Sequence, residues 1–230
     1  KSNILFKYLI SIFLISLISL LLIAQPDIGQ TLLVIFCWAV LIFTSGINIY
    51  ILLAIFIAGA SLLTYLIIYV PRFDYIQGRI FSFFNRETGT HNFQSDKAIE
   101  SITSGGFFGK GIGEGVLKNR VPEAHTDYII SVISEEFGVV AIMLILLLFL
   151  ILIYMVFKKI SFETNDKAKL ILIGSISLIL MQATIHIGVN IRLFPTTGMT
   201  LPFLSYGGSS IISTSILAGI ILNLTKRKIT

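Results

Sequence analysis

Charged residues are scarce in this sequence. Of its 230 residues, 17 are Lys or Arg and 12 are Asp or Glu, so 13% are charged. A soluble domain carries about 25%. With 55% of its residues hydrophobic, most of the surface of this chain does not face water.

Cysteine is nearly absent as well. Cys37 is the only one and lies inside the apolar run LLVIFCWAVLIF, which rules out an internal disulfide and indicates a small buried side chain. No soluble domain, low-complexity tract or fixed-period repeat can be recognised. The net charge of +5 gives no reason to invoke nucleic acid, because the position of the basic residues has another explanation.

Long apolar runs, in contrast, occur six times at about the 20 residues that a membrane-spanning helix needs. They cover roughly residues 4–24, 28–44, 47–70, 128–157, 168–189 and 209–225. The first is too long for the apolar part of a signal peptide, and LIAQPD offers no cleavage site. The sequence therefore predicts an all-α, polytopic transmembrane helix bundle, with residues 1–230 forming one integral membrane domain.

The basic residues predict the orientation of this bundle. An N-terminus on the cytoplasmic side places nine of them there and one, Arg192, on the short outer connections. The nine are Lys1, Lys7, Lys158, Lys159, Lys167, Lys169, Lys226, Arg227 and Lys228. Both termini are then cytoplasmic, and the connection 71–126 is one long extracytoplasmic loop.

This loop is unusually long and unusually rich in glycine. A connection of more than fifty residues is uncommon unless it has a function. Within it, RIFSFFN (79–85) is typical of an amphipathic interfacial segment, and QSDKAIESITSGG (94–106) of a short helix stopped by glycines. GGFFGKGIGEG (105–115) has six glycines around Lys110. Such a backbone can approach a ligand closely or form an anion-binding nest, and a flexible surface loop is the alternative.

The motif PEAHTD places an aspartate at the mouth of the fourth span. If the helix begins near residue 126, a polar stripe falls on one face of it: Asp127, Ser131, Ser134, Glu135 and Gly138. Lipid would penalise such a stripe, so it should face a cavity or other helices. Asp127 either caps the helix N-terminus or acts chemically in a cavity, and the spacing leaves both open.

The connection 190–210 between the last two spans is too apolar for an ordinary wet loop. We interpret it as a buried or re-entrant connection that lines a cavity, where irregular backbone is tolerated. Ser209 and Ser210 after Gly207 and Gly208 predict the N-cap of the last helix, whose N-terminus would suit an anion. A structural hinge is the alternative.

Four motifs occur in the order found in the SEDS family of shape, elongation, division and sporulation proteins. They are QPDIGQ, SGGFFGKGIGEG, PEAHTDYIISVISEEFG and FPTTGMTLPFLSYGGSS. The resemblance covers the chain from Gln25 onward, and PEAHTD and PTTGMTLP look more like the division member than the elongation member. Tyr128 stands where phenylalanine is usual. The family has ten spans, and six correspond to the last six, so we expect a C-terminal portion or a truncated product.

The resemblance implies a peptidoglycan glycosyltransferase of the bacterial inner membrane, acting at the division septum. Such proteins polymerise lipid II at the outer face and work with a class B penicillin-binding protein, the transpeptidase, and other divisome membrane proteins. The transfer is an inverting one from a glycan donor linked to polyprenyl pyrophosphate. An acceptor hydroxyl loses its proton as it attacks, and a carboxylate at the membrane boundary can take that proton.

The same resemblance assigns one site residue, and the position of other polar residues near it in the sequence suggests the rest. Asp127 corresponds to the catalytic aspartate. The expected substrate-binding residues are Lys110, Lys118 and Arg120 for the pyrophosphate, with Glu123, His125, Ser209 and Ser210 around them. A divalent cation, Mg²⁺ or Mn²⁺, can assist such chemistry, but the sequence does not indicate which residues would bind it.

Two other functions stay open. A lipid II flippase would need polar groups along the whole transmembrane path, yet here they gather at the outer ends apart from Gln182 and His186. A non-catalytic scaffold that recruits the transpeptidase is the second.

Overall fold

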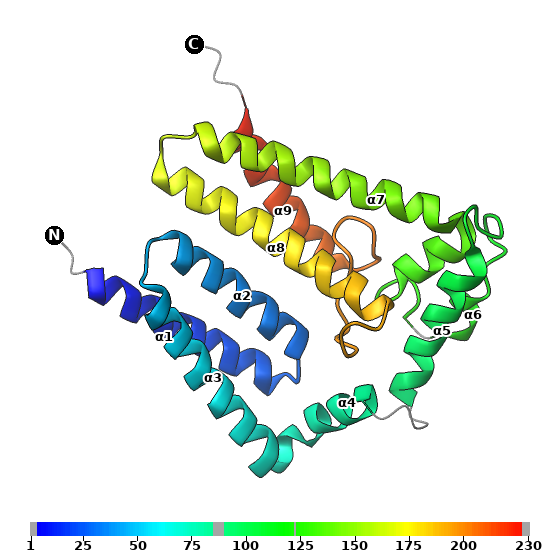
Figure 1. Ribbon diagram of the computed structural model, residues 1–230, viewed down its shortest axis with the longest axis horizontal. Helices are drawn as coiled ribbons and strands as arrows, with labels where there is room; N and C mark the ends of the chain where they lie inside the picture. The colour runs from blue at the N-terminus through cyan, green and yellow to red at the C-terminus, as the bar shows by residue number, and fades with distance from the viewer. Residues whose placement is uncertain (1–3, 85–89, 122, 227–230) are drawn as a thin grey trace.

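The computed structural model describes residues 4–84, 90–121 and 123–226, and within these ranges the regular structure is entirely helical (Figure 1). The elements are α1 (Ile4–Ala24), α2 (Ile28–Thr44), α3 (Ile49–Tyr69), the 3-10 turn η1 (Pro71–Phe73), α4 (Asp74–Phe84), α5 (Thr90–Gly105), α6 (Leu117–Arg120), α7 (Ile129–Phe162), α8 (Asp166–Asn190) and α9 (Gly208–Thr225).

The prediction of an all-α membrane bundle is confirmed. In the described part of the chain, five helices are long and apolar enough to cross a membrane: α1, α3, α7, α8 and α9. The remaining predicted span, 28–44, corresponds to α2, an apolar helix of 17 residues. The number of spans and the side on which the 71–126 connection lies stay predictions.

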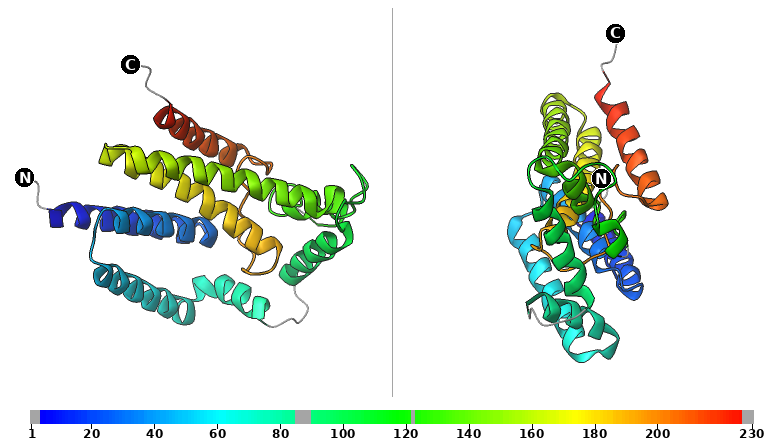
Figure 2. Two further views of the ribbon diagram at one scale, coloured as in Figure 1. Left: turned by 45° about the horizontal axis from the view of Figure 1, so that its top comes forward. Right: turned by 90° about the vertical axis from the view of Figure 1, so that its right-hand side faces the viewer.

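The bundle is built around α8. Helix α7 lies beside it, and α9 and α2 pack on different sides of it, while α1 packs on α2 (Figure 2). One apolar core joins α7, α8 and α9 through Val156, Leu172, Ile176, Ile179 and Ile221. Toward the other end, α5 and α6 from the long connection lie against α7, and this is where most of the buried polar residues gather.

Helix α7 is interrupted at Gly138. This residue has φ 79° and ψ −178°, which breaks the helical hydrogen bonding around it. The amides of Lys110 and Gly111 donate to the carbonyls of Glu135 and Glu136, at 2.9 and 3.1 Å. The glycine-rich loop is therefore docked into a gap in α7 by backbone hydrogen bonds.

Close backbone approach explains several of the glycines. A Cβ on Gly105 would lie 2.0 Å from the Ser134 carbonyl oxygen, and one on Gly138 would lie 2.2 Å from the Phe107 carbonyl oxygen. No side chain fits at such distances. The glycines allow the loop and α7 to meet, which is a sufficient structural reason for their presence.

The predicted cap of α9 is wrong, and of the two roles left open for Asp127 the structure does not show the capping one. Tyr128, not Asp127, is the N-cap of α7, and its side chain makes no capping hydrogen bond. The N-cap of α9 is Gly207, so Ser209 and Ser210 already lie in the first turn. Asp127 thus sits just outside the helix.

Candidate functional site

A small cavity of about 130 Å³ lies next to Asp127. It is formed where α4, α5, the start of α7, the end of α8 and the connection after α8 meet. Its described lining consists of Arg79, Gln94, Asp127, Tyr128, Val189, Thr196, Gly198 and Met199. Segments more than a hundred residues apart in sequence therefore build one site.

Asp127 is held in place by its backbone. The side-chain amide of Asn190, which is fully buried, donates from Nδ2 to the Asp127 carbonyl oxygen at 2.9 Å. The Oδ1 atom of Asn190 accepts from the Ser131 amide at 3.3 Å and from its hydroxyl at 2.7 Å. This clamp joins the end of α8 to the start of α7 and leaves the Asp127 carboxylate to the cavity.

Residues 191–207, which we name the roof segment, cover the cavity. Gln182 on α8 donates to the carbonyl and hydroxyl oxygens of Thr200, both at 3.0 Å, and to Ser210 Oγ at 3.2 Å. His186 Nδ1 lies 2.7 Å from the Met199 carbonyl oxygen. The connection is only partly buried: Met199, Leu201 and Ser205 are buried, whereas Leu193, Phe203 and Tyr206 are exposed. Its re-entrant course stays a prediction.

The roof segment is also fastened to the PEAHTD motif. Ser205 Oγ donates to the Thr126 carbonyl oxygen at 2.6 Å, and the Tyr206 amide donates to the His125 carbonyl oxygen at 3.1 Å. A Cβ placed on Gly198 would lie 3.6 Å from Asp127 Oδ2. The two motifs therefore form one unit around the carboxylate.

The QPDIGQ motif supports the roof segment from the other side. Asp27 caps α2 by accepting the Gln30 amide at 2.9 Å. A Cβ on Gly29 would lie 2.8 Å from Met199 Cγ and 3.0 Å from Thr197 Cβ. The start of α2 thus packs directly beneath the roof segment.

Arg79 is a site residue that sequence reasoning missed. It lies on α4 and lines the cavity, with Nη1 3.3 Å from the Thr196 carbonyl oxygen. The motif RIFSFFN had been interpreted only as interfacial. The sequence does contain one indication of this role, an arginine on an amphipathic helix upstream of PEAHTD. The sequence alone does not show that Arg79 and Asp127 lie close together.

The surroundings of Asp127 make its carboxyl group more basic. Burial raises its pKa above the ordinary value of 3.8, and the negative charge of Glu123 raises it further. A hydrogen bond with Thr126 and the positive charge of Arg79 act in the opposite direction. The net rise favours a group that accepts a proton.

The other predicted site residues lie in different places. Lys110 Nζ forms a 2.8 Å ion pair with the buried Glu135, whose Oε2 also accepts the Val116 and Leu117 amides at 3.0 and 2.9 Å. Arg120 is exposed on α6, while the side chain of Lys118 lies outside the described part of the structure.

Of the remaining four, three are exposed and one is partly buried. Glu123 Oε2 accepts from the Thr126 hydroxyl at 2.8 Å, and His125 and Ser209 are exposed. The Ser210 hydroxyl accepts from Thr200 Oγ1 at 2.7 Å. Among the predicted residues whose side chains are described, only Asp127 lines the cavity.

Within the described ranges, no group of three or more His, Cys, Asp or Glu residues is placed to hold a metal ion. Asp127 is the one carboxylate among the described residues that line the cavity. A need for a divalent cation stays a prediction.

Comparison with known protein families and sequences gives consistent matches. The profile of a family described as "Cell cycle protein", of the FtsW, RodA and SpoVE type, matches residues 1–229. A protein of Francisella salina named "Probable peptidoglycan glycosyltransferase FtsW" is 38% identical over 221 residues. Those of Caulobacter vibrioides and Enterococcus hirae, with the same name, are 36% and 32% identical over 214 and 236 residues.

The matched regions cover most of this chain but only part of the relatives. They include 92%, 90% and 97% of this chain for the Francisella, Caulobacter and Enterococcus proteins, respectively. They include 53%, 52% and 59% of the relatives. The chain thus spans little more than half the length of these proteins.

Similar solved structures include the following two. One comes from work titled "Structural coordination of polymerization and crosslinking by a peptidoglycan synthase complex"; the TM-score is 0.75 at 29% identity, over 95% of this chain and 60% of that one. The other is a mutant of the Thermus thermophilus rod shape determining protein RodA, with a TM-score of 0.61 at 28% identity, over 98% and 58%.

Proposed function

The chain belongs to the FtsW, RodA and SpoVE family of cell cycle proteins, and on this premise we propose that it carries the catalytic site of a peptidoglycan glycosyltransferase. The substrate is lipid II, and the product is a glycan strand. The observation that carries the proposal is a partly buried carboxylate in a cavity that it shares with an arginine, at one end of a membrane bundle.

Asp127 is the general base of this reaction. The acceptor hydroxyl transfers its proton to the carboxylate while its oxygen attacks the anomeric carbon of the donor sugar. The bond from that carbon to the polyprenyl pyrophosphate breaks, and the leaving group takes the electron pair. A base with a raised pKa is better matched to this task at neutral pH than an ordinary aspartate.

Arg79 is the cation best placed to meet the pyrophosphate as it leaves. Its guanidinium is permanently charged and presents donors in a fork that suits phosphate oxygens. It shares the cavity with Asp127, whereas Lys110 is paired with Glu135. Positive charge aimed at developing negative charge lowers the barrier of such a transfer.

The size of the cavity restricts what enters it. Ligand pockets usually measure about 300–1,000 Å³, and this one holds about 130 Å³. A hydroxyl and a phosphate group fit, but a disaccharide does not. We therefore assign the cavity to the reacting groups and place the rest of both sugars outside it.

The flippase alternative loses support from the contacts of Gln182 and His186. Both side chains bind the roof segment, so they are engaged in holding the site together. A path for a charged headgroup needs free polar groups along its length.

Partners and location follow the relatives. A similar structure belongs to a complex whose title joins polymerisation with crosslinking. We therefore propose a class B penicillin-binding protein as partner, with other division proteins, at the septum of a bacterial inner membrane. Both termini of the chain are assigned to the cytoplasm.

The decisive experiment exchanges the matched part of a full-length FtsW relative for this chain and assays lipid II polymerisation with the cognate transpeptidase. Asp127→Asn keeps the size and polarity of the side chain but cannot accept the proton. The rate should fall by roughly 10²–10⁴, while membrane insertion, partner binding and lipid II binding persist.

Glu114→Gln is the matched control, because Glu114 is an exposed carboxylate on the glycine-rich loop. It should leave the rate unchanged. If Asp127→Asn polymerises lipid II as fast as this control, the catalytic assignment is wrong.

A further inference from the structure

A second and larger hollow lies at the opposite end of the bundle. It measures about 750 Å³ and opens between the α1–α2 pair on one side and α8 with α9 on the other. We name it the α1–α8 crevice. Its described lining consists of Lys7, Tyr8, Ser11, Cys37, Trp38, Leu41, Ile42, Ser45, Leu170, Ile171, Gly174, Ser175, Leu178 and Leu217.

The walls of the crevice are mostly apolar, and their polar groups are largely satisfied. Trp38 Nε1 donates to Ser11 Oγ at 2.7 Å, and the hydroxyls of Tyr8 and Ser45 lie 3.3 Å apart. Leu41 packs on α8 where a Cβ on Gly174 would lie 3.3 Å away. The crevice therefore offers an apolar surface with little demand for further hydrogen bonds.

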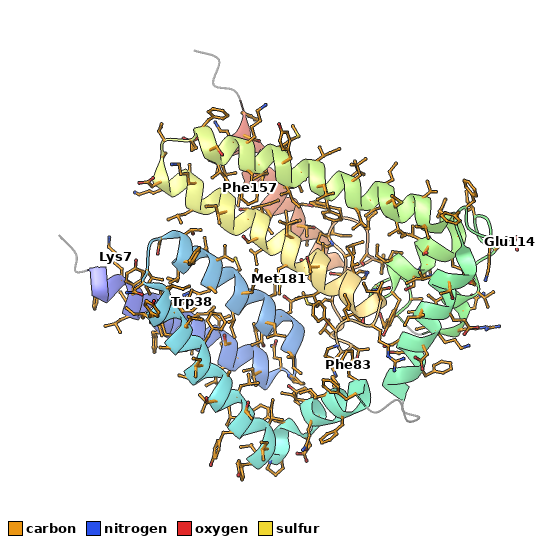
Figure 3. The ribbon with its side chains drawn as sticks, in the orientation of Figure 1. Lys7, Trp38, Phe83, Glu114, Phe157 and Met181 are labelled. Carbon is orange, nitrogen blue, oxygen red and sulfur yellow. The ribbon has the colours of Figure 1, made fainter. Side chains whose placement is uncertain are left out.

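Lys7 is the exception. It is exposed, lines the crevice, and has no ion-pair partner among the described residues. Figure 3 shows it beside Trp38 at the end of the bundle where α1 begins. A cation at the rim of an apolar hollow matches a ligand with one negative headgroup and a long apolar tail.

The described residues at this end of the bundle carry a net positive charge. The described basic residues here are Lys7, Lys158, Lys159, Lys167, Lys169 and Lys226, and the described acidic ones are Glu163 and Asp166. Basic pockets between transmembrane helices attract anionic lipid headgroups. The positive charge of the surrounding residues thus adds to the attraction between Lys7 and an anionic headgroup.

We propose that the α1–α8 crevice binds an anionic phospholipid of the bilayer. The phosphate lies against Lys7, and an acyl chain lies along Trp38, Leu41 and Ile171. A volume of about 750 Å³ is within the range of ligand-binding pockets in general. This site lies at the other end of the bundle from Asp127 and does not depend on the proposed function.

Native mass spectrometry of the purified chain tests the proposal. The chain is mixed with equal amounts of phosphatidylglycerol and phosphatidylcholine that carry identical acyl chains, and the ratio of bound lipids is measured. Phosphatidylglycerol should be retained several-fold over phosphatidylcholine. Lys7→Gln should reduce that preference about five-fold, the effect of one lysine at a membrane surface.

Two further variants separate the headgroup from the tail. Lys169→Gln removes a lysine from the same end that faces Asp166, at 4.0 Å, and does not line the crevice, so the preference should stay. Ile171→Trp places a larger side chain in the crevice at a half-exposed position, so binding of both lipids should weaken together. Size-exclusion chromatography checks that each variant is folded.

Equal binding of the two lipids by the unchanged chain would overturn the proposal, since the crevice would then accept any tail. The same holds if Lys7→Gln behaves like Lys169→Gln. Retention of phosphatidylglycerol by Ile171→Trp would show that the lipid binds elsewhere.

Discussion

Asn190 holds Asp127 by its main chain: the Nδ2 atom of Asn190 donates to the carbonyl oxygen of Asp127 at 2.9 Å, while Oδ1 accepts from Ser131. Asn190 therefore positions Asp127 through its main chain and does not bind the carboxylate that is proposed to act as the base. The same amide also donates to the His186 carbonyl oxygen at 2.9 Å, so one buried side chain satisfies four polar atoms of α8, α7 and Asp127.

This clamp predicts that Asn190→Asp slows glycan polymerisation without abolishing binding of lipid II. An aspartate keeps the acceptor but cannot donate to the Asp127 carbonyl, and it adds a negative charge beside the base. Because misplacement of a catalytic group by about 1 Å can cost 10²-fold, kcat should fall by about that factor while KM changes little. Steady-state kinetics measure this split. A variant that loses affinity for lipid II at unchanged kcat would contradict a positioning role.

The raised pKa of Asp127 predicts the pH dependence of the reaction. The base must be deprotonated to act, so activity falls as the pH drops through its pKa, and the acid limb of kcat/KM should lie above the ordinary value of 3.8. Arg79→Gln removes a charge that stabilises the carboxylate, so the acid limb of kcat/KM should move to higher pH. Arg79→Lys retains the positive charge, so the acid limb should stay where it is. An unmoved limb in Arg79→Gln would show that this charge does not act on Asp127.

The ion pair of Glu135 with Lys110 predicts unequal effects of its two halves. Glu135 is buried and also accepts two backbone amides, so Glu135→Gln should destabilise the fold by about 3 kcal/mol. Lys110→Met leaves those amides on the carboxylate and removes only its partly exposed cation, so it should cost less, about 1.5 kcal/mol. Thermal unfolding in detergent measures both. A stable Lys110→Met variant with weakened lipid II binding would instead place Lys110 on the substrate, as the glycine-rich motif first suggested.

The break in α7 predicts that Gly138→Ala destabilises the protein by more than about 2 kcal/mol. The added Cβ would meet the Phe107 carbonyl oxygen at 2.2 Å, and the positive φ is strained for alanine. Gly59→Ala in α3 is the matched control, because nothing lies within 4 Å of its Cβ position. The control should be neutral or slightly stabilising. Equal melting temperatures for the two variants would mean that α7 does not need the break.

The distribution of basic residues predicts the sidedness of the bundle. In a Cys37→Ala background, a single cysteine at Gly113 should react with a membrane-impermeant maleimide added outside intact cells, and one at Asn165 should not. Both positions are exposed, so access depends on the side of the membrane. The reverse pattern of labelling would invert the topology.

The sequence was informative about the helices because apolar runs of membrane length have few alternative structures. The ends of α1, α2, α3 and α8 fall within two residues of their predicted positions. Asp127 was found from a motif. Arg79 and Asn190 could not be found in this way, because their roles depend on the packing of α4 and α8 against the PEAHTD motif. The cap of α9 was also missed: Ser210 instead accepts hydrogen bonds from Gln182 and Thr200, which are tertiary contacts that no local pattern reports.

The contact of Gly29 with Thr197 and Met199 has a mechanical consequence. A cavity of about 130 Å³ must widen before a bulky ligand reaches Asp127, and the roof segment is the part that covers it. Because α2 packs directly under that segment, lifting it either separates this contact or carries α2 along. Helix α1 is packed on α2. Movement of the α1–α2 pair would therefore be coupled to opening of the roof segment over the cavity. A protein that binds α1 or α2 would then change how often the cavity opens without contacting the cavity itself.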